Sequence, residues 1–159
     1  MEFNAEADDL LIGVVGGGAM GQGIVQVSLE GMMRVVLFDA KPDGSSEARD
    51  AVFSRLERNV EKGRLEKDAL DKMKENLIIA KDFSGFSECN VVVEAVFEDI
   101  DVKLDVFKEI ETEVAPNCII ASNTSSLPIA SLGRYCQHQN RFAGLHFFNP
   151  VPLMKLVEV

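Results

Sequence analysis

The stretch LLIGVVGGGAMGQGIVQVSLEGMMRVVLFD, residues 10–39, decides the fold of this chain. It begins and ends with short apolar runs, at 10–15 and 35–39, and continuous runs of this length are typical of strands buried on both faces. Between them, the segment from Ala19 to Glu30 has the length and the apolar spacing of a helix. A strand, a glycine turn, a helix and a strand within about 30 residues form a βαβ unit, whose crossover is right-handed in nearly all proteins.

The rest of the chain repeats this alternation. Apolar runs predict further strands at 77–80, 91–96, 118–122 and 141–148, and periodic segments predict helices at about 45–62, 66–75 and 102–114. We expect the first two of these helices to project from the sheet as a pair, with Ser45 or Ser46 as a cap. The sequence therefore predicts an α/β fold with a Rossmann-type, doubly wound and mostly parallel sheet, in one domain covering residues 1–159.

Composition restricts the partners of this domain. Asp and Glu number 26 against 16 Lys and Arg, which gives a formal net charge of −10. Such a chain repels phosphate backbones at long range, so no nucleic-acid or membrane partner is expected, although backbone amides can still bind a small anion. The apolar runs also fall short of the roughly 18 residues that a membrane span needs.

The cysteines and the first residues bear on location. Cys89, Cys118 and Cys136 lie far apart and without zinc spacing, which indicates buried thiols in a reducing compartment and no metal site. The stretch MEFNAEADD, residues 1–9, carries acids and no base, the opposite of a signal or transit peptide. These features favour a cytoplasmic location.

The turn after the first strand fits the motif GxGxxG at Gly16, Gly18 and Gly21, with Ala19 and Met20 inside it. Gly16 permits a tight turn, Gly18 lets the backbone approach a pyrophosphate, and Gly21 lets the helix pack closely against the strand. Unpaired amides at the start of the helix would bind the phosphates. Such a turn can be purely structural, but its place between a strand and a helix predicts dinucleotide binding.

Asp39 ends the next strand, at the distance from the glycines that the motif requires. A carboxylate there accepts hydrogen bonds from a ribose 2′-hydroxyl and repels a 2′-phosphate, which predicts NAD rather than NADP. Lys41 nearby weakens this preference slightly. Without the glycines, an acid that caps a turn would be the simpler interpretation.

A polar loop, Ser122 to Ser126, follows the strand predicted at 118–122. Ligands of open α/β sheets bind beyond the carboxyl ends of the strands, so a hydroxyl here could hold a substrate oxygen. Equally, Ser125 or Ser126 could cap the short helix expected around 129–132.

His146 lies in an apolar run near the end of the chain. As a base beside a hydroxyl, an imidazole would assist the loss of hydride from the adjoining carbon. A lone histidine in such a run is more often a hydrogen-bonded core residue, but Glu158 follows across a PVP turn, and its carboxylate could orient the ring. We expect His146 and the glycine turn on different strands of one sheet, at its carboxyl side.

From Leu11 to its last residue, the chain resembles the NAD-binding domain of L-3-hydroxyacyl-CoA dehydrogenases, which include bacterial 3-hydroxybutyryl-CoA dehydrogenases. The resemblance rests on the segments GVVGGGAMGQGI, VVLFD, VEKG, VVVEAVFEDIDVK, IIASNTSSLPI and RFAGLHFFNPVPLMKLVEV. It implies the reversible oxidation of an L-3-hydroxyacyl-CoA to the 3-oxoacyl-CoA, with NAD accepting hydride.

The resemblance also implies roles for individual residues. His146 would be the general base that takes the hydroxyl proton, Glu158 would orient it, and Ser125 would contact the reacting oxygen. Contacts with the nicotinamide end of NAD are implied for Glu98, Lys103, Asn123 and Asn149. Lys62 would approach the phosphates of the acyl-CoA substrate. The alternative interpretation is that Lys62 is a solvent-exposed lysine at the end of a helix.

Members of this family continue past KLVEV into a mostly helical domain that closes the substrate cleft, supplies an asparagine to the reacting oxygen and forms most of the dimer interface. Residues 1–159 lack that domain. We therefore expect a fragment that binds NAD but is weak or inactive as a catalyst, taken from a homodimeric enzyme. Apolar surface near the last strand should lie uncovered, which predicts self-association.

Two alternatives stay open. A dinucleotide-binding sensor or structural module would share the glycine turn and Asp39 but would not need Ser125, His146 or Glu158. A related dehydrogenase of non-CoA alcohols would need those three residues without a site for CoA.

Overall fold

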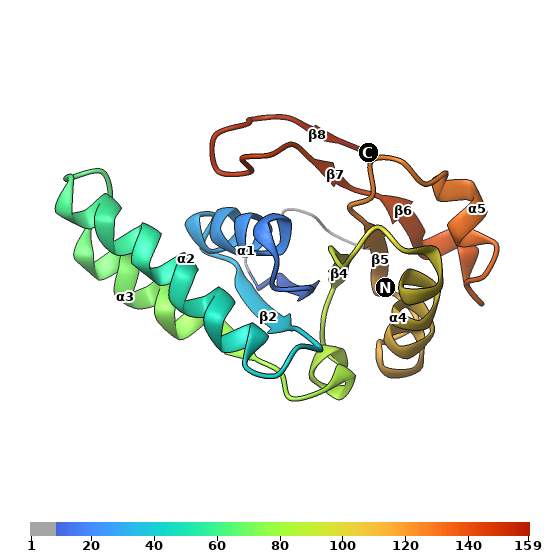
Figure 1. Ribbon diagram of the computed structural model, residues 1–159. Coiled ribbons are helices and arrows are strands. Elements are labelled where there is room, and N and C mark those ends of the chain that lie inside the picture. Colours follow the sequence, from blue (N-terminus) through green and yellow to red (C-terminus); the bar gives the residue numbers. More distant parts are fainter. Residues whose placement is uncertain (1–8) are drawn as a thin grey trace.

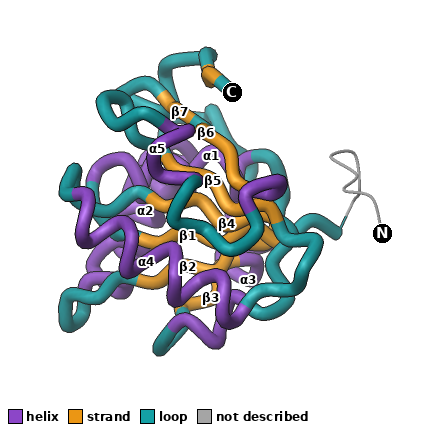
Figure 2. Tube along the Cα trace, turned by 90° about the vertical axis from the view of Figure 1, so that its right-hand side faces the viewer, coloured by secondary structure: helices purple, strands orange, loops and turns teal. Residues whose placement is uncertain are grey.

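Six parallel strands form the central sheet of the computed structural model, which describes residues 9–159 (Figure 1). They are β1 (Leu11–Val15), β2 (Arg34–Phe38), β3 (Leu77–Ile79), β4 (Val91–Glu94), β5 (Ile119–Ser122) and β6 (Phe142–Gly144). Their order is β3-β2-β1-β4-β5-β6, which Figure 2 shows from the lower edge of the sheet to the upper. This order confirms the predicted Rossmann-type sheet, whose ligand crevice lies where the winding reverses, beside β1 and β4.

Helices cover both faces of the sheet (Figure 1). One face carries α1 (Ala19–Glu30), α2 (Gly44–Glu61) and α3 (Lys67–Asn76), and the other carries α4 (Ile100–Glu113), α5 (Ile129–Gly133) and a 3₁₀ turn, Phe83–Phe86. A second 3₁₀ turn, Gln139–Arg141, leads into β6. Because strand side chains alternate, Val14 packs under the first layer and Val15 under the second.

The helical pair α2 and α3 extends away from the sheet at its connecting loop (Figure 1). Its inner side is nevertheless part of the core, since Val52, Leu56, Leu70 and Met73 are buried there. The expected serine cap is wrong. The helix begins at Gly44, and Ser45 Oγ instead accepts a hydrogen bond from the Asp39 N–H at 2.7 Å.

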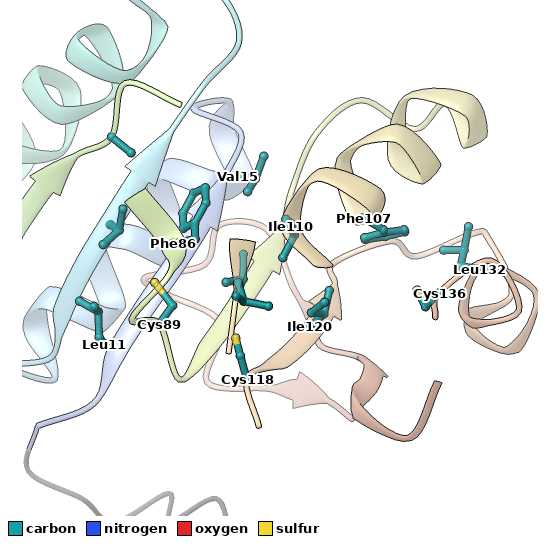
Figure 3. Packing of buried hydrophobic residues seen from close by; sticks show 14 residues of the cluster. Leu11, Val15, Phe86, Cys89, Phe107, Ile110, Cys118, Ile120, Leu132 and Cys136 are labelled. Atoms are coloured by element: carbon teal, nitrogen blue, oxygen red, sulfur yellow. The ribbon is translucent and has the colours of Figure 1, made fainter. Parts of the chain in front are cut away.

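The three cysteines are buried free thiols in the core on the α4 side, where Figure 3 shows Cys89 next to Phe86. Burial raises the pKa of Cys89 to about 12 and the pKa values of Cys118 and Cys136 to about 11. At neutral pH all three are therefore protonated and pack as small apolar side chains.

The run predicted as one strand at 141–148 is divided between two sheets. After β6 pairs with β5, β7 (His146–Phe147) pairs antiparallel with β8 (Val157–Glu158) in a separate two-stranded sheet. The placement of His146 in the main sheet was therefore wrong. Because β5 ends at Ser122, the chain beyond Gly144 pairs with its own returning segment instead.

Candidate active site

The glycine turn connects β1 to α1 and needs glycine at two positions. Gly16 has a φ of 109°, a backbone conformation that disfavours other residues. A Cβ at Gly21 would lie 1.8 Å from the Gly16 carbonyl oxygen, so only glycine lets the helix start this close to the turn. A Cβ at Gly18 would meet nothing within 4 Å among the described residues. The backbone at Gly18 is therefore open to an incoming ligand.

A cleft of about 550 Å³, referred to below as the main cleft, lies over this turn. Gly16, Gly18, Ala19 and Met20 line it, and Asp39 lies on its wall. The Asp39 carboxylate accepts hydrogen bonds from the Gly17 N–H at 2.5 Å and from the Lys41 N–H at 2.7 Å. Asp39 thus caps a turn, and its oxygens keep lone pairs for a second acceptor role toward a ribose.

A smaller pocket, of about 270 Å³, adjoins the first beside Met20 and Ala95. It brings together most of the residues singled out above, namely Met20, Glu98, Lys103, Asn123, Ser125, His146 and Asn149. They come from segments that follow the carboxyl ends of β1, β4, β5 and β6, with Met20 in the first turn of α1 and Lys103 in the first turn of α4, and these strand ends meet at one edge of the sheet.

Lys103 lines this pocket and belongs to a buried ion pair. Lys103 Nζ lies 2.6 Å from Glu94 Oε1, and the two side chains are 1% and 0% exposed. Ser122 Oγ donates to Glu94 Oε2 at 2.6 Å, and the Val96 N–H donates to Oε1 at 2.8 Å. Glu94 and Ser122 were missed as site residues, although an acid inside the apolar run VVVE already signals a need for a partner.

Glu98 continues the network toward the polar loop. Its carboxylate lies 3.6 Å from Lys103 Nζ and accepts hydrogen bonds from the hydroxyls of Thr124 and Ser126. Burial opposes ionisation of Glu98, but these hydroxyls and the Lys103 charge outweigh it and lower the pKa of Glu98.

The alternative that Ser125 or Ser126 caps α5 is wrong, because that helix begins at Ile129 after Pro128.

The His146 ring pairs with the Glu158 carboxylate, Nδ1 to Oε2 at 2.9 Å. The pairing follows from backbone register, because His146 and Glu158 are direct partners in the β7–β8 ladder. With the Glu158 carboxylate as acceptor, Nδ1 donates this hydrogen bond and Nε2 lies on the other side of the ring. His146 is 24% exposed at its side chain and lines two pockets, both of which also contain Ser125.

Asn123 ties the main sheet to this pair. Its Oδ1 accepts from the Phe147 N–H at 2.9 Å, while its own N–H donates to the Glu94 carbonyl at 2.9 Å. The Asn123 side chain thus fixes β7, and with it His146, against the end of β4.

Lys62 lies apart from these residues, in a second cleft of about 550 Å³ between α1, the end of α2 and the loop 149–153. Arg55, Arg58 and Arg64 line the same cleft, referred to below as the basic cleft, although the chain as a whole is acidic. Asn149 belongs both to this cleft and to the pocket of His146. The three arginines were missed, although their spacing along one helix and its exit turn was a readable signal.

Two features are absent from residues 9–159. These residues contain no group of three or more His, Cys, Asp or Glu placed to hold a metal ion. Among their helices, none is long and apolar enough to cross a membrane.

Comparisons with known proteins agree with this geometry. The family model for the 3-hydroxyacyl-CoA dehydrogenase NAD-binding domain matches residues 11–159. A probable 3-hydroxybutyryl-CoA dehydrogenase of Deinococcus radiodurans is 40% identical over 147 residues, which cover 92% of this chain and 52% of the relative. The mitochondrial hydroxyacyl-coenzyme A dehydrogenase of Sus scrofa is 40% identical over 152 residues, 92% of this chain and 48% of that protein.

A solved structure gives the same result. The (S)-3-hydroxybutyryl-CoA dehydrogenase of Ralstonia eutropha superposes with a TM-score of 0.89 at 35% identity, over 92% of this chain and 52% of that one. The chain thus spans about half the length of the relatives it matches. With its sheet order, its glycine turn and a family match over nearly all its residues, the chain belongs to the family of 3-hydroxyacyl-CoA dehydrogenase NAD-binding domains.

Proposed function

We propose that this chain provides the NAD-binding part of an active site that oxidises an L-3-hydroxyacyl-CoA to the 3-oxoacyl-CoA, or catalyses the reverse reduction. The observation that carries the proposal is the His146–Glu158 pair. His146 and Ser125 line the pocket next to the cleft of the glycine turn, and Glu158 lines a second pocket together with the same two residues. A dinucleotide-binding module without catalysis would not require a base, its orienting carboxylate and a hydroxyl at this place.

The geometry suits removal of a hydroxyl proton. His146 Nε2 would take the proton from the C3 hydroxyl, Glu158 would stabilise the resulting imidazolium, and the Ser125 hydroxyl would bind the reacting oxygen. Hydride loss from C3 becomes easy only when that proton departs, so base and cofactor must flank one carbon. Bound NAD supplies the hydride acceptor.

Residues of the main cleft would hold the cofactor. The turn from Gly16 to Gly21, including Ala19 and Met20, would bind the pyrophosphate with backbone amides, and Asp39 would accept from the adenosine ribose. The nicotinamide end would contact Glu98, Lys103, Asn123 and Asn149. The open space at Gly18 supports this arrangement, because nothing among the described residues lies within 4 Å of the position that a Cβ would take there.

The basic cleft would receive the charged end of the substrate. Lys62, together with Arg55, Arg58 and Arg64, would attract the phosphates of CoA, and Asn149 connects that cleft with the pocket of His146. This continuity favours a CoA thioester over the alternative of a non-CoA alcohol.

We also propose that the 159 residues bind NAD but turn over substrate slowly, and that the active protein is a homodimer. Both proposals follow the family resemblance and the exposure of the pocket, in which the Glu158 side chain is 65% exposed. A cytoplasmic location is proposed from the three buried free thiols, which suit a reducing compartment.

The test combines binding with turnover. We expect His146→Gln to lower the rate of acetoacetyl-CoA reduction by NADH by roughly a hundredfold or more, because a general base is lost. NAD binding, measured by calorimetry, should persist in the same variant. His138→Gln is the matched control, since that histidine is exposed and lies outside the pocket.

Equal turnover by the parent and His146→Gln would contradict the role of His146. NAD binding without any binding of acetoacetyl-CoA would favour the sensor. Turnover by the 159 residues at the rate of a complete family member would contradict the expected weak activity.

A further inference from the structure

Lys41 lies on the wall of the main cleft, two residues beyond Asp39. Among the described residues that line this cleft, it is the one cation, and Asp39 and Glu47 are the carboxylates. An ammonium beside the ribose-binding acid is the group that a 2′-phosphate would use, because lysine binds phosphate readily. Left free, Lys41 would therefore weaken the discrimination that Asp39 provides.

The Lys41 ammonium is engaged by Glu47. Lys41 Nζ donates to Glu47 Oε2 at 2.6 Å, and Glu47 stands in the first turn of α2. The hydrogen bond to Glu47 and its charge raise the pKa of Lys41, which keeps the ammonium protonated and paired. Both side chains are largely exposed, at 65% and 61%, so a ligand in the cleft would meet the pair directly.

Unlike the exposed side chains of Lys41 and Glu47, the Asp39 carboxylate is held in place by hydrogen bonds. Its two oxygens are held by the backbone N–H groups of Gly17 and Lys41. The carboxylate therefore cannot turn away from a phosphate, whereas the Lys41 side chain can move toward one as soon as its partner is removed.

We propose that Glu47 is a specificity-determining residue, which occupies the Lys41 ammonium, so that the cleft selects a dinucleotide with a free ribose 2′-hydroxyl. The inference rests on the proposed role of this cleft as the NAD site. It assigns the preference for NAD to three side chains rather than to Asp39 alone.

The experiment compares two probes of the adenosine end, adenosine 2′,5′-bisphosphate and 5′-AMP, by calorimetry at low ionic strength. Glu47→Gln frees Lys41, so we expect the affinity ratio of the bisphosphate to AMP to rise roughly fivefold, the size suited to an exposed charge-assisted contact. The gain should shrink at high salt, because exposed charges are screened.

Two further variants separate the causes. The double variant Lys41→Ala/Glu47→Gln should lose the gain, because the freed ammonium is gone. Glu57→Gln is the matched control: Glu57 is on the same helix, pairs with Lys74 at 2.7 Å and lies outside the cleft. Its ratio should equal that of the parent.

An unchanged ratio in Glu47→Gln, with NAD binding intact, would overturn the inference alone. A gain that persists in the double variant would also overturn it, since the effect would then be loss of negative charge without Lys41. If the parent bound neither NAD nor AMP, the proposed cofactor site and this inference would both fail.

Discussion

Glu94 and Lys103 form an ion pair with almost no exposure, at the end of β4 and the start of α4. Both Glu94 oxygens are used, one by Lys103 and the Val96 N–H and the other by Ser122. Removing one member of a buried pair costs more than removing both, because a lone charge then remains away from water. The pair therefore contributes both to the stability of the fold and to the position of Lys103 in the candidate site.

We predict that Glu94→Ala lowers the free energy of unfolding by about 3–5 kcal/mol, while Glu94→Met/Lys103→Met restores most of it. Urea denaturation measures both. The control is Glu57→Ala, which breaks an exposed pair and should cost under about 1 kcal/mol. Equal losses of unfolding free energy in Glu94→Ala and Glu57→Ala would contradict the prediction, because they would mean that the buried Lys103 ammonium is not destabilised by the loss of Glu94.

Single residues could be predicted where local sequence carries the reason. The glycine spacing and Asp39 fit one turn and one strand end, so a short window contains the whole pattern. The partners of Glu94 could not be read this way, because they depend on the β4–β5 register, which places Glu94 opposite Ser122, and on where α4 crosses the sheet.

Among the elements, the strands follow apolar runs and the helices follow periodic segments, and apart from the run 141–148 their bounds lie within two residues of those predicted. The division of the run 141–148 was not predicted, since β-forming residues indicate a strand without indicating its partner. Here Gly144 lies against Ile129 of α5, where a Cβ would come within 2.8 Å of the Ile129 side chain, and the next residues leave the sheet.

A carboxylate of α4 holds the segment that leads to β6. The Glu111 side chain, 3% exposed, accepts from the N–H groups of Gln137 and His138, while Arg141 donates to the Ala115 carbonyl at 2.7 Å. These contacts join the end of α4 to the entry of the edge strand. The strand that precedes His146 therefore depends on contacts made by the carboxyl end of α4.

We predict that Glu111→Ala lowers the free energy of unfolding by about 1–3 kcal/mol, because two backbone donors lose their acceptor. Amide hydrogen exchange should accelerate first in β6. Glu109→Ala, an exposed position on the same helix, serves as the control. Uniform acceleration over all six strands would contradict a local role for Glu111.

At the scale of the whole molecule, two cores on opposite faces of the sheet stabilise the fold, whereas the region around β8 stays apolar and open. Leu153, Leu156 and Val159 are 75%, 52% and 97% exposed. Exposed apolar side chains gathered in this way commonly mark a contact surface. The uncovered surface expected near the last strand is thus present.

We predict concentration-dependent self-association of the chain, measured by sedimentation. Leu153→Ser/Leu156→Ser should weaken it, because the apolar area available for contact falls. Tyr135→Ser removes an equally exposed side chain, 68% exposed, outside this region and should leave association unchanged. A monomer at all concentrations would contradict the prediction.

The β7–β8 hairpin determines where this region can tolerate inserted or deleted residues. His146 and Glu158 face each other as one rung of a ladder, and a shift of one residue in either strand would send one side chain to the opposite face. Within the connecting loop, Asn149 lines the candidate site and Val151 is buried in the core, whereas residues 154–156 are exposed and lie outside the ladder. Insertions and deletions can therefore accumulate at 154–156 and change the numerical distance between base and carboxylate, while a single inserted residue inside either strand would separate the two.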